Sequence, residues 1–181
     1  MENDNNKFPK DNLEQKRDVR MKESKQEEVL YWYAAKALYN RQVSIIEELQ
    51  KAGNKIFNNK LASSLVFIKC TENEILRIKQ VYWSRMFIYM NAEKAKPYAI
   101  PEDQMNTFIY ITTIDPDGAS YLGDDKAEYH QGERVRVKEG PFKGMEGHIK
   151  RIKKDRRVIV SINGIAAIAL AHIPLQFLEK V

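Results

Sequence analysis

The sequence predicts an α+β fold in two small parts, an antiparallel sheet with flanking helices followed by a C-terminal all-β barrel. Segments with strand and helix patterns alternate between residues 29 and 118, which is typical of an α+β sandwich. From residue 132 onward, apolar residues recur at every second position, as they do in strands with one buried face. A chain of 181 residues is long enough for two small domains. We therefore expect domains at 29–118 and 132–181, joined by a linker at 119–131.

Residues 1–28 are expected to form a disordered or partly helical tail. Their apolar side chains are too few to bury the surface that would offset the entropy lost on ordering. The segment also lacks the apolar stretch of a secretory signal, and no apolar run in the chain approaches the roughly 20 residues that cross a bilayer. The sequence therefore predicts a cytoplasmic protein without a membrane partner.

The first domain is predicted to begin with a strand and a helix. Residues 29–35 form a short apolar and aromatic run, which is typical of a strand buried on at least one face. Asn40 is a suitable N-cap for an amphipathic helix, and Gly53 can supply the left-handed residue that ends it. A second strand is predicted at 64–70.

Two more helices and one strand complete the predicted first domain. Thr71 and Glu74 have the spacing of a capping box, which predicts a helix that starts there. A third strand is expected at 86–90. Pro101 suits the first position of a last helix, which should end near Asp115 because turn residues follow.

Four strands separated by turns are predicted in the second domain. The Asn-Gly pair at 163–164 is the strongest hairpin signal in the chain, and another turn is expected at 154–155. Several short strands in so short a segment favour a closed barrel, because closure removes exposed edges. The predicted strands contain Val135 and Val137, and then span 148–152, 158–162 and 165–173.

Charge is distributed unevenly along the chain. Residues 132–181 contain 11 basic and 5 acidic residues, whereas the two charge types nearly balance in residues 1–131. This excess favours a nucleic-acid or acidic-protein contact in the second domain over one elsewhere.

The sequence indicates no catalytic centre and no cofactor. Cys70 lies in an apolar strand, where a buried and unreactive side chain is favoured. His130, His148 and His172 do not have the spacing of a metal site. The sequence contains no phosphate-binding loop, nucleophile elbow or dinucleotide fingerprint. We therefore predict a binding protein without cofactor or metal, not an enzyme.

One glycine-rich segment, 132–147, is similar to the KOW motif. It combines a strand, a Gly-Pro-Phe turn, a second glycine and a third glycine that begins the next strand. Glycine suits positions where the chain turns with positive φ or where two backbones approach closely. The residues that carry the resemblance are Gly132, Gly140, Pro141, Phe142, Gly144 and Gly147.

Upstream segments resemble the N-terminal (NGN) domain of the NusG family. Trp32-Tyr33 opens the first strand, the strands at 65–68 and 85–87 follow, and 99–102 leads into the last helix. Together with the KOW segment, they imply a NusG-type transcription elongation or antitermination factor with an SH3-like KOW barrel. The family's usual Pro-Gly-Tyr is replaced at 63–65 by Ser-Ser-Leu, and the preceding loop is short. Both departures suggest a specialised paralogue, similar to those that act on polysaccharide operons in Bacteroides-type bacteria.

The resemblance implies that the N-terminal domain binds the clamp of RNA polymerase, near the nucleic acid of the elongation complex, and suppresses pausing or termination. The positions that match the family's contact patch are Lys36, Leu65, Phe67 and Phe87. Alternation places Leu65 and Phe67 on one face of their strand, so they belong either to this patch or simply to the core. The resemblance further implies a monomer whose KOW domain recruits a second partner, such as Rho or a ribosomal protein.

A run of basic residues in the barrel has two interpretations. It can contact phosphates without sequence specificity, or it can be a solvated hairpin that protects the barrel against association. The first interpretation leads to an alternative function, an RNA-binding KOW protein of the ribosome or another ribonucleoprotein. The residues of the run are Lys150, Arg151, Lys153, Lys154, Arg156 and Arg157.

Overall fold

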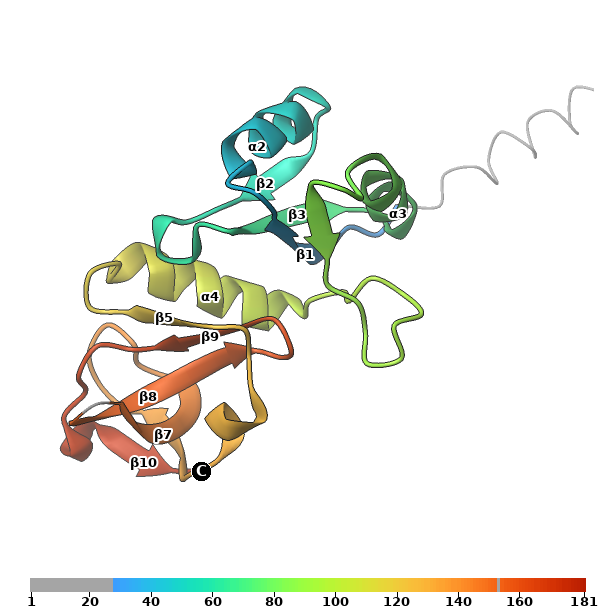
Figure 1. Cartoon of the computed structure of the whole chain (residues 1–181). Helices are drawn as coiled ribbons and strands as arrows, with labels where there is room; N and C mark the ends of the chain where they lie inside the picture. The colour runs from blue at the N-terminus through green and yellow to red at the C-terminus, as the bar shows by residue number, and fades with distance from the viewer. Residues whose placement is uncertain (1–27, 153) are drawn as a thin grey trace, which may run out of the picture.

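The computed structural model describes residues 28–152 and 154–181, so the expected tail lies almost wholly outside the described residues. Three α-helices and two antiparallel sheets make up the described part, which confirms the α+β fold class (Figure 1). None of these helices has the length and apolar character needed to cross a membrane.

The N-terminal sheet has four strands in the order β2-β3-β1-β4, and all neighbours are antiparallel. β1 (Tyr31–Ala37), β3 (Leu65–Cys70) and β4 (Met86–Ile88) confirm the three predicted strands. β2 (Lys55–Phe57) was not predicted, because three residues carry too little pattern to distinguish a strand from a loop. A short 3-10 helix, η1 (Lys60–Ala62), leads from β2 into β3.

Helices α2 (Gln42–Lys51) and α3 (Glu72–Val81) cover one face of this sheet. The cap predicted at Thr71 is confirmed, because its Oγ1 accepts a hydrogen bond from the Glu74 backbone N–H at 3.2 Å. The cap predicted at Asn40 is wrong. Its φ of 55° places it in a left-handed turn after β1, which asparagine tolerates, and α2 begins only two residues later.

Helix α4 (Glu102–Ile114) covers the opposite face of the N-terminal sheet. Pro101 immediately precedes the helix, one position earlier than predicted. Phe108 packs on Phe67 of β3 with the ring centroids 4.9 Å apart, and both side chains are buried. The helix ends at the turn residues around Asp115, as predicted.

The C-terminal sheet has six strands in the order β10-β6-β7-β8-β9-β5, all antiparallel. It contains the strands predicted for the barrel and two that were not predicted, β5 and β10. These two are its edges, so backbone hydrogen bonding among the described strands does not close the expected barrel completely. The strands are β5 (Ser120–Gly123), β6 (Arg134–Val137), β7 (Glu146–Ile152), β8 (Asp155–Ile162), β9 (Ala166–Ala169) and β10 (Leu178–Lys180).

One of the two predicted turns of this sheet is confirmed and the other is displaced. Asn163 and Gly164 connect β8 to β9, and Gly164 has a φ of 70°. The turn expected at 154–155 is wrong by one residue, because Asp155 belongs to β8 and pairs with Ile152. Residues 153–157 are all charged, so apolar alternation could not locate the strand end.

The segment expected to be a linker, 119–131, is folded. Within it, β5 pairs with β9, and a 3-10 helix, η2 (Ala127–His130), follows. The few apolar residues of β5 show no strand pattern by themselves, because the strand depends on its partner β9.

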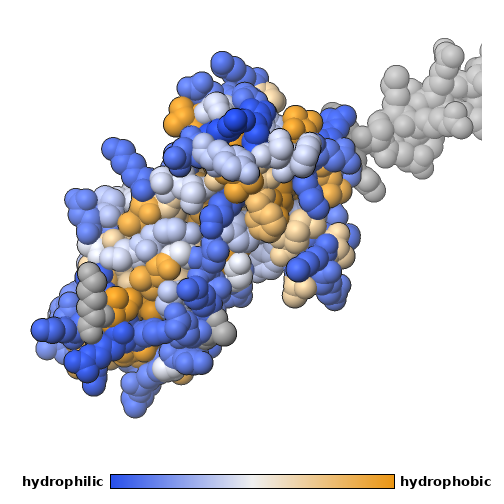
Figure 2. Space-filling view, in the orientation of Figure 1, coloured by the Kyte–Doolittle hydropathy of each residue, from blue (hydrophilic) through white to orange (hydrophobic). Residues whose placement is uncertain are grey.

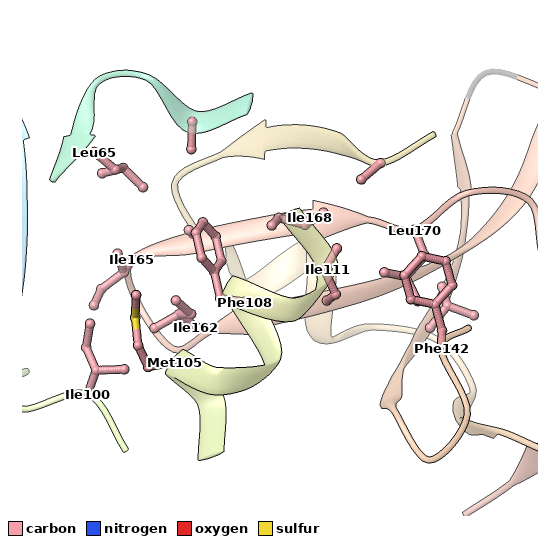
Figure 3. Close-up of a cluster of buried hydrophobic side chains, with 14 of the residues drawn as sticks. Leu65, Ile100, Met105, Phe108, Ile111, Phe142, Ile162, Ile165, Ile168 and Leu170 are labelled. Atoms are coloured by element: carbon pink, nitrogen blue, oxygen red, sulfur yellow. The ribbon is translucent and has the colours of Figure 1, made fainter. Parts of the chain in front are cut away.

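The two sheets share one cluster of buried side chains, and α4 lies between them (Figures 1 and 3). Leu65 comes from the N-terminal sheet, Phe108 from α4 and Ile168 from the C-terminal sheet. The domains expected at 29–118 and 132–181 therefore pack on each other through this cluster and are not joined by the segment 119–131 alone. We refer to residues 28–118 as the N-terminal unit and to residues 119–181 as the C-terminal unit.

Candidate functional site

The two faces of β3 have different partners. Val66 and Ile68 point towards α2 and α3, whereas Leu65 and Phe67 point towards α4. Leu65 is 0% exposed and Phe67 is 1% exposed. Of the two alternatives that the sequence leaves open for this pair, the structure shows the core, and neither side chain reaches the surface.

The other two candidates for a polymerase contact, Lys36 and Phe87, lie opposite each other on β1 and β4. They share the α4 face of the sheet with Leu65, but Phe87 is 52% exposed, so α4 leaves this end of the face open. The rings of Phe87 and Tyr89 meet edge to face, with their centroids 5.4 Å apart. We call Lys36, Phe87 and Tyr89 the edge patch, because β4 is an edge strand.

An apolar groove of about 590 Å³ adjoins the edge patch on the α3 side of β4. Trp83, which is 76% exposed, lines it together with Leu76 and Phe87. Hydrophobic groups reach the surface among hydrophilic ones in the upper part of the molecule (Figure 2). Exposed tryptophan and phenylalanine side chains that line one groove are typical of protein interfaces.

Asp124, directly after β5, connects the C-terminal unit to the edge patch. Its Oδ1 accepts hydrogen bonds from Tyr89 Oη at 2.9 Å and from Lys36 Nζ at 3.4 Å. Burial raises the pKa of the Tyr89 hydroxyl, and the Asp124 carboxylate raises it further, so the hydroxyl remains a donor. The C-terminal unit therefore already contacts two of the three edge-patch residues.

The next residue, Asp125, contacts the C-terminal unit itself. Its Oδ2 accepts hydrogen bonds from His130 Nε2 at 2.8 Å and from the Gly164 backbone N–H at 3.0 Å. The side chain is 5% exposed, and its Oδ1 has no hydrogen-bond partner in the described part of the chain. Of these two consecutive residues, Asp124 therefore contacts the N-terminal unit and Asp125 contacts the C-terminal unit.

His130 also meets His148 of β7, with the ring centroids 5.7 Å apart. Burial lowers the pKa of His148 below its ordinary value, and the neighbouring His130 and Arg134 lower it further. Among residues 28–152 and 154–181, no three metal-binding side chains form a cluster. Sequence spacing could not reveal the histidine pair, because the packing of η2 against β7 creates it.

The glycines of the KOW segment permit close backbone contacts. Gly132 has a φ of 113°, and a Cβ there would lie 2.5 Å from the carbonyl oxygen of Ile149. At Gly147 a Cβ would lie 2.3 Å from the carbonyl oxygen of Ile159. A side chain at either position would therefore push β7 away from its neighbours. The two turn glycines, Gly140 and Gly144, have φ values of 85° and 88°.

The Gly-Pro-Phe turn contacts α4. Phe142 is buried in the shared cluster, and the Pro141 carbonyl oxygen accepts a hydrogen bond from Tyr110 Oη at 2.7 Å. Near the start of α4, Gln104 Oε1 accepts a hydrogen bond from the Asn163 backbone N–H at 3.4 Å. A cavity of about 670 Å³ is lined by α4, residues 143–145, β7 and β8. The predicted KOW residues thus shape the sheet and its contact with α4.

Two of the six basic residues in the β7–β8 hairpin are anchored within the fold. Lys150 Nζ lies 3.3 Å from Glu128 Oε2 and 5.0 Å from the centre of the Tyr129 ring. Arg157 donates a hydrogen bond to Ser120 Oγ at 3.2 Å. Both side chains therefore tie the hairpin to the segment that contains β5 and η2.

The remaining basic residues lie towards the turn of this hairpin. Arg151 and Arg156 are directly opposite each other on β7 and β8, and both are exposed. Lys154 is exposed in the turn, whereas Lys153 lies outside the described residues. We call Arg151, Lys154 and Arg156 the basic tip.

Cys70 is buried, as predicted from the sequence. Burial raises the pKa of its thiol to about 12, with a smaller effect from Glu74. The thiol is therefore protonated at neutral pH and is a poor nucleophile.

The family model described as the KOW motif matches residues 131–162, which confirms the KOW resemblance of this segment. Among solved structures, the chain is similar to one described as domain interaction in Thermotoga maritima NusG, with 17% identity and a TM-score of 0.48. That alignment covers 84% of this chain and 98% of the other. A chain of the MjSpt4:Spt5 complex in conformation A has 15% identity and a TM-score of 0.32, over 83% of this chain and 97% of the other. A search among curated proteins found no match.

Proposed function

We propose that this chain is a cytoplasmic transcription elongation factor of the NusG type that binds RNA polymerase through its N-terminal unit. The observation that carries the proposal is the KOW motif at 131–162, which follows an α+β unit with an antiparallel sheet. The proposed activity is binding, and it needs no cofactor and no catalytic residue. In this proposal the bound factor suppresses pausing or termination, as a specialised paralogue, and its C-terminal unit recruits a second partner such as Rho or a ribosomal protein.

The edge patch and the adjoining groove form the surface that best suits a large protein partner. Phe87 and Trp83 supply exposed aromatic anchors, which contribute most of the binding energy in many interfaces. Lys36 adds a positive charge at the same place, so a helix with apolar and acidic residues would complement this surface. Leu65 and Phe67 are left out of this surface, because they are buried beneath α4.

The contact with Asp124 makes binding at the edge patch a competition. A partner carboxylate that pairs with Lys36 has to replace Asp124, whose side chain is 51% exposed. Exposed ion pairs contribute only about 0–1 kcal/mol, so this exchange costs little. The docked C-terminal unit is therefore compatible with polymerase binding at Phe87 and Trp83.

Replacing Phe87 by Asp tests both the function and the surface. We expect the wild-type chain to retain core RNA polymerase in a pull-down and to increase read-through of a terminator in transcription assays. Phe87→Asp should lose both effects, because a buried carboxylate would face the apolar anchor site of the partner. The matched control is Val43→Asp, which changes an exposed apolar residue on α2, in the layer opposite α4.

The outcomes separate the function from its site. If the wild-type chain neither retains polymerase nor changes read-through, the proposed function is wrong. If the wild-type chain and Phe87→Asp bind equally well, only the proposed surface is wrong.

The positive charge of the C-terminal unit favours a second candidate, an RNA-binding protein of the ribosome or another ribonucleoprotein. Residues 132–181 carry 11 basic and 5 acidic residues. For this candidate, the chain would bind structured RNA tightly without polymerase, and Phe87→Asp would leave that binding unchanged. Polymerase retention that depends on Phe87 would exclude it as the main function.

A further inference from the structure

The basic tip places like charges where the fold does not require them. Arg151 and Arg156 occupy directly opposed positions of an antiparallel ladder, where two like charges destabilise the pair. The two arginines lie on the same face of the hairpin as Ile149 and Val158, but two residues closer to the turn. Both arginines are exposed. The structure of the unit therefore gives no reason for two arginines at these positions.

Elsewhere in the C-terminal unit, neighbouring cations have carboxylate partners. Arg134 and Arg136 both contact Glu146, at 2.7 Å and 2.6 Å, and Lys180 pairs with Glu133. In contrast, no carboxylate of the described residues forms an ion pair with any of the three basic-tip side chains. The tip is thus a local concentration of positive charge in a unit that neutralises many of its other cations.

The position of the tip leaves it accessible. The start of the β8 arrow, next to the β7–β8 turn, lies at the lower left of Figure 1, at the opposite end of the molecule from α2 and α3. In Figure 2, hydrophilic groups line the lower left edge of the molecule, with hydrophobic groups immediately inside that edge. A ligand can therefore reach the tip without displacing the N-terminal unit.

The surroundings of the tip distinguish between classes of ligand. Leu175 and Val181 are the exposed large hydrophobic residues of the described C-terminal unit, and neither lies in the hairpin. A protein interface would need apolar or aromatic anchors there, and a single-stranded nucleic acid would need aromatic rings on which its bases could stack. Arginine forks bind phosphate oxygens without either feature.

We propose that the basic tip binds the phosphate backbone of a double-stranded nucleic acid, without reading its sequence. Arg151 on β7 and Arg156 on β8 contact phosphates from the same face of the hairpin, and Lys154 adds a third cation at the turn. The bound phosphates neutralise the two opposed arginines, as carboxylates do for Arg134, Arg136 and Lys180 elsewhere in the unit. This inference does not depend on the proposed polymerase contact, which lies on the other unit.

Salt dependence of binding provides the direct test on the full-length chain. We would measure fluorescence anisotropy with a labelled DNA duplex and with an RNA duplex of the same sequence. Contacts to two or three phosphates predict a slope of about −1.8 to −2.7 for log K against log salt, which weakens binding about 12- to 42-fold between 50 and 200 mM. The duplex that binds more tightly identifies the source of the phosphates.

The double variant Arg151→Gln/Arg156→Gln should reduce that slope by about 2 and lower the affinity for both duplexes. Its melting temperature should equal or exceed that of the wild type, since an unfavourable charge pair is removed. The control Lys138→Gln/Lys143→Gln removes the same net charge from two exposed lysines outside the hairpin. We expect the control to keep the wild-type slope to within about one unit.

Three outcomes would overturn the proposal. The wild-type chain could fail to bind either duplex at low salt, or the two double variants could lose affinity equally, which would indicate a general charge effect. Polyglutamate could also displace the duplex at equal charge concentration, which would indicate an acidic protein as the ligand. The proposal is supported if Arg151→Gln/Arg156→Gln loses duplex binding while it remains folded and the control variant keeps that binding.

Discussion

Two of the contacts between the C-terminal unit and the N-terminal unit differ most in their chemistry. At α4 the contact is apolar, and Phe108 shares a buried cluster with side chains of both sheets. At Asp124 the contact is polar, and the carboxylate is half exposed. Buried apolar area stabilises by about 25 cal/mol per Å², whereas an exposed ion pair contributes about 0–1 kcal/mol. The α4 contact therefore contributes more to the stability of the arrangement than the Asp124 contact does.

The largest effect is expected from Phe108→Ala, which removes the ring at the centre of the apolar contact. The ring is 3% exposed and packs on Phe67. Truncation of a buried phenylalanine costs about 3–5 kcal/mol, from lost burial and from the cavity left behind. Denaturant unfolding monitored by circular dichroism would measure this loss. Because the cluster is shared, we expect the wild type to unfold in one transition that involves both sheets.

Tyr110→Phe is the matched control on the same helix. It removes only the hydroxyl that donates to the Pro141 carbonyl oxygen, at an exposed position. The loss should be about 1 kcal/mol or less. Two separate unfolding transitions in the wild type, or similar losses in both variants, would contradict the central role of the apolar contact.

An intermediate effect is expected at Asp125, and a smaller one at Asp124. Asp125→Ala removes a charged side chain that is 5% exposed and accepts hydrogen bonds from the Gly164 N–H and from His130, which costs about 1–3 kcal/mol. Asp124→Ala removes the exposed contacts to Lys36 and Tyr89 and should cost about 1 kcal/mol. Thermal unfolding of the two variants under identical conditions would compare them.

Asp125→Asn sharpens this comparison. The amide oxygen can still accept both hydrogen bonds, and the substitution removes the charge from a carboxylate whose Oδ1 has no partner in the described residues. We therefore expect Asp125→Asn to be milder than Asp125→Ala. An equal loss in both would show that the negative charge, rather than the hydrogen-bond acceptor, holds the segment.

Local signals in the sequence predicted most of the elements. The Thr71 cap, the left-handed Gly164 and the KOW glycines all depend on neighbours within a few residues, and the structure contains each of them. β5 could not be predicted in this way, because it exists through pairing with β9 and is followed by charged residues that resemble a linker. Long-range pairing overrides weak local pattern.

The candidate site was predictable only in part. Alternation identified Leu65 and Phe67 as one face of a strand but could not tell whether a helix, a second unit or a partner covers that face. Phe87 was predicted and is exposed, whereas Trp83 and Tyr89 carried no motif. The contacts of Asp124 and Asp125 depend on how the two units pack, which no local pattern encodes.

The smallest effect concerns the pH dependence of stability, at His148 on β7. His148 has a pKa below its ordinary value near 6.5, because of burial first and then because of His130 and Arg134. In the pH range between the folded and the unfolded pKa, the unfolded chain binds more protons than the folded chain. Stability therefore decreases as the pH falls below about 6.5 and is restored as the pH rises.

His148→Gln should flatten this part of the profile, because it removes the group whose protonation differs between the two states. The free energy of unfolding would be measured at steps between about pH 8 and pH 5, above the range in which carboxylates such as Glu146 titrate. The fall should be small, since His148 is only partly buried. A wild-type stability that rises on acidification, or a fall that is equally large in His148→Gln, would contradict the assignment of this pH dependence to His148.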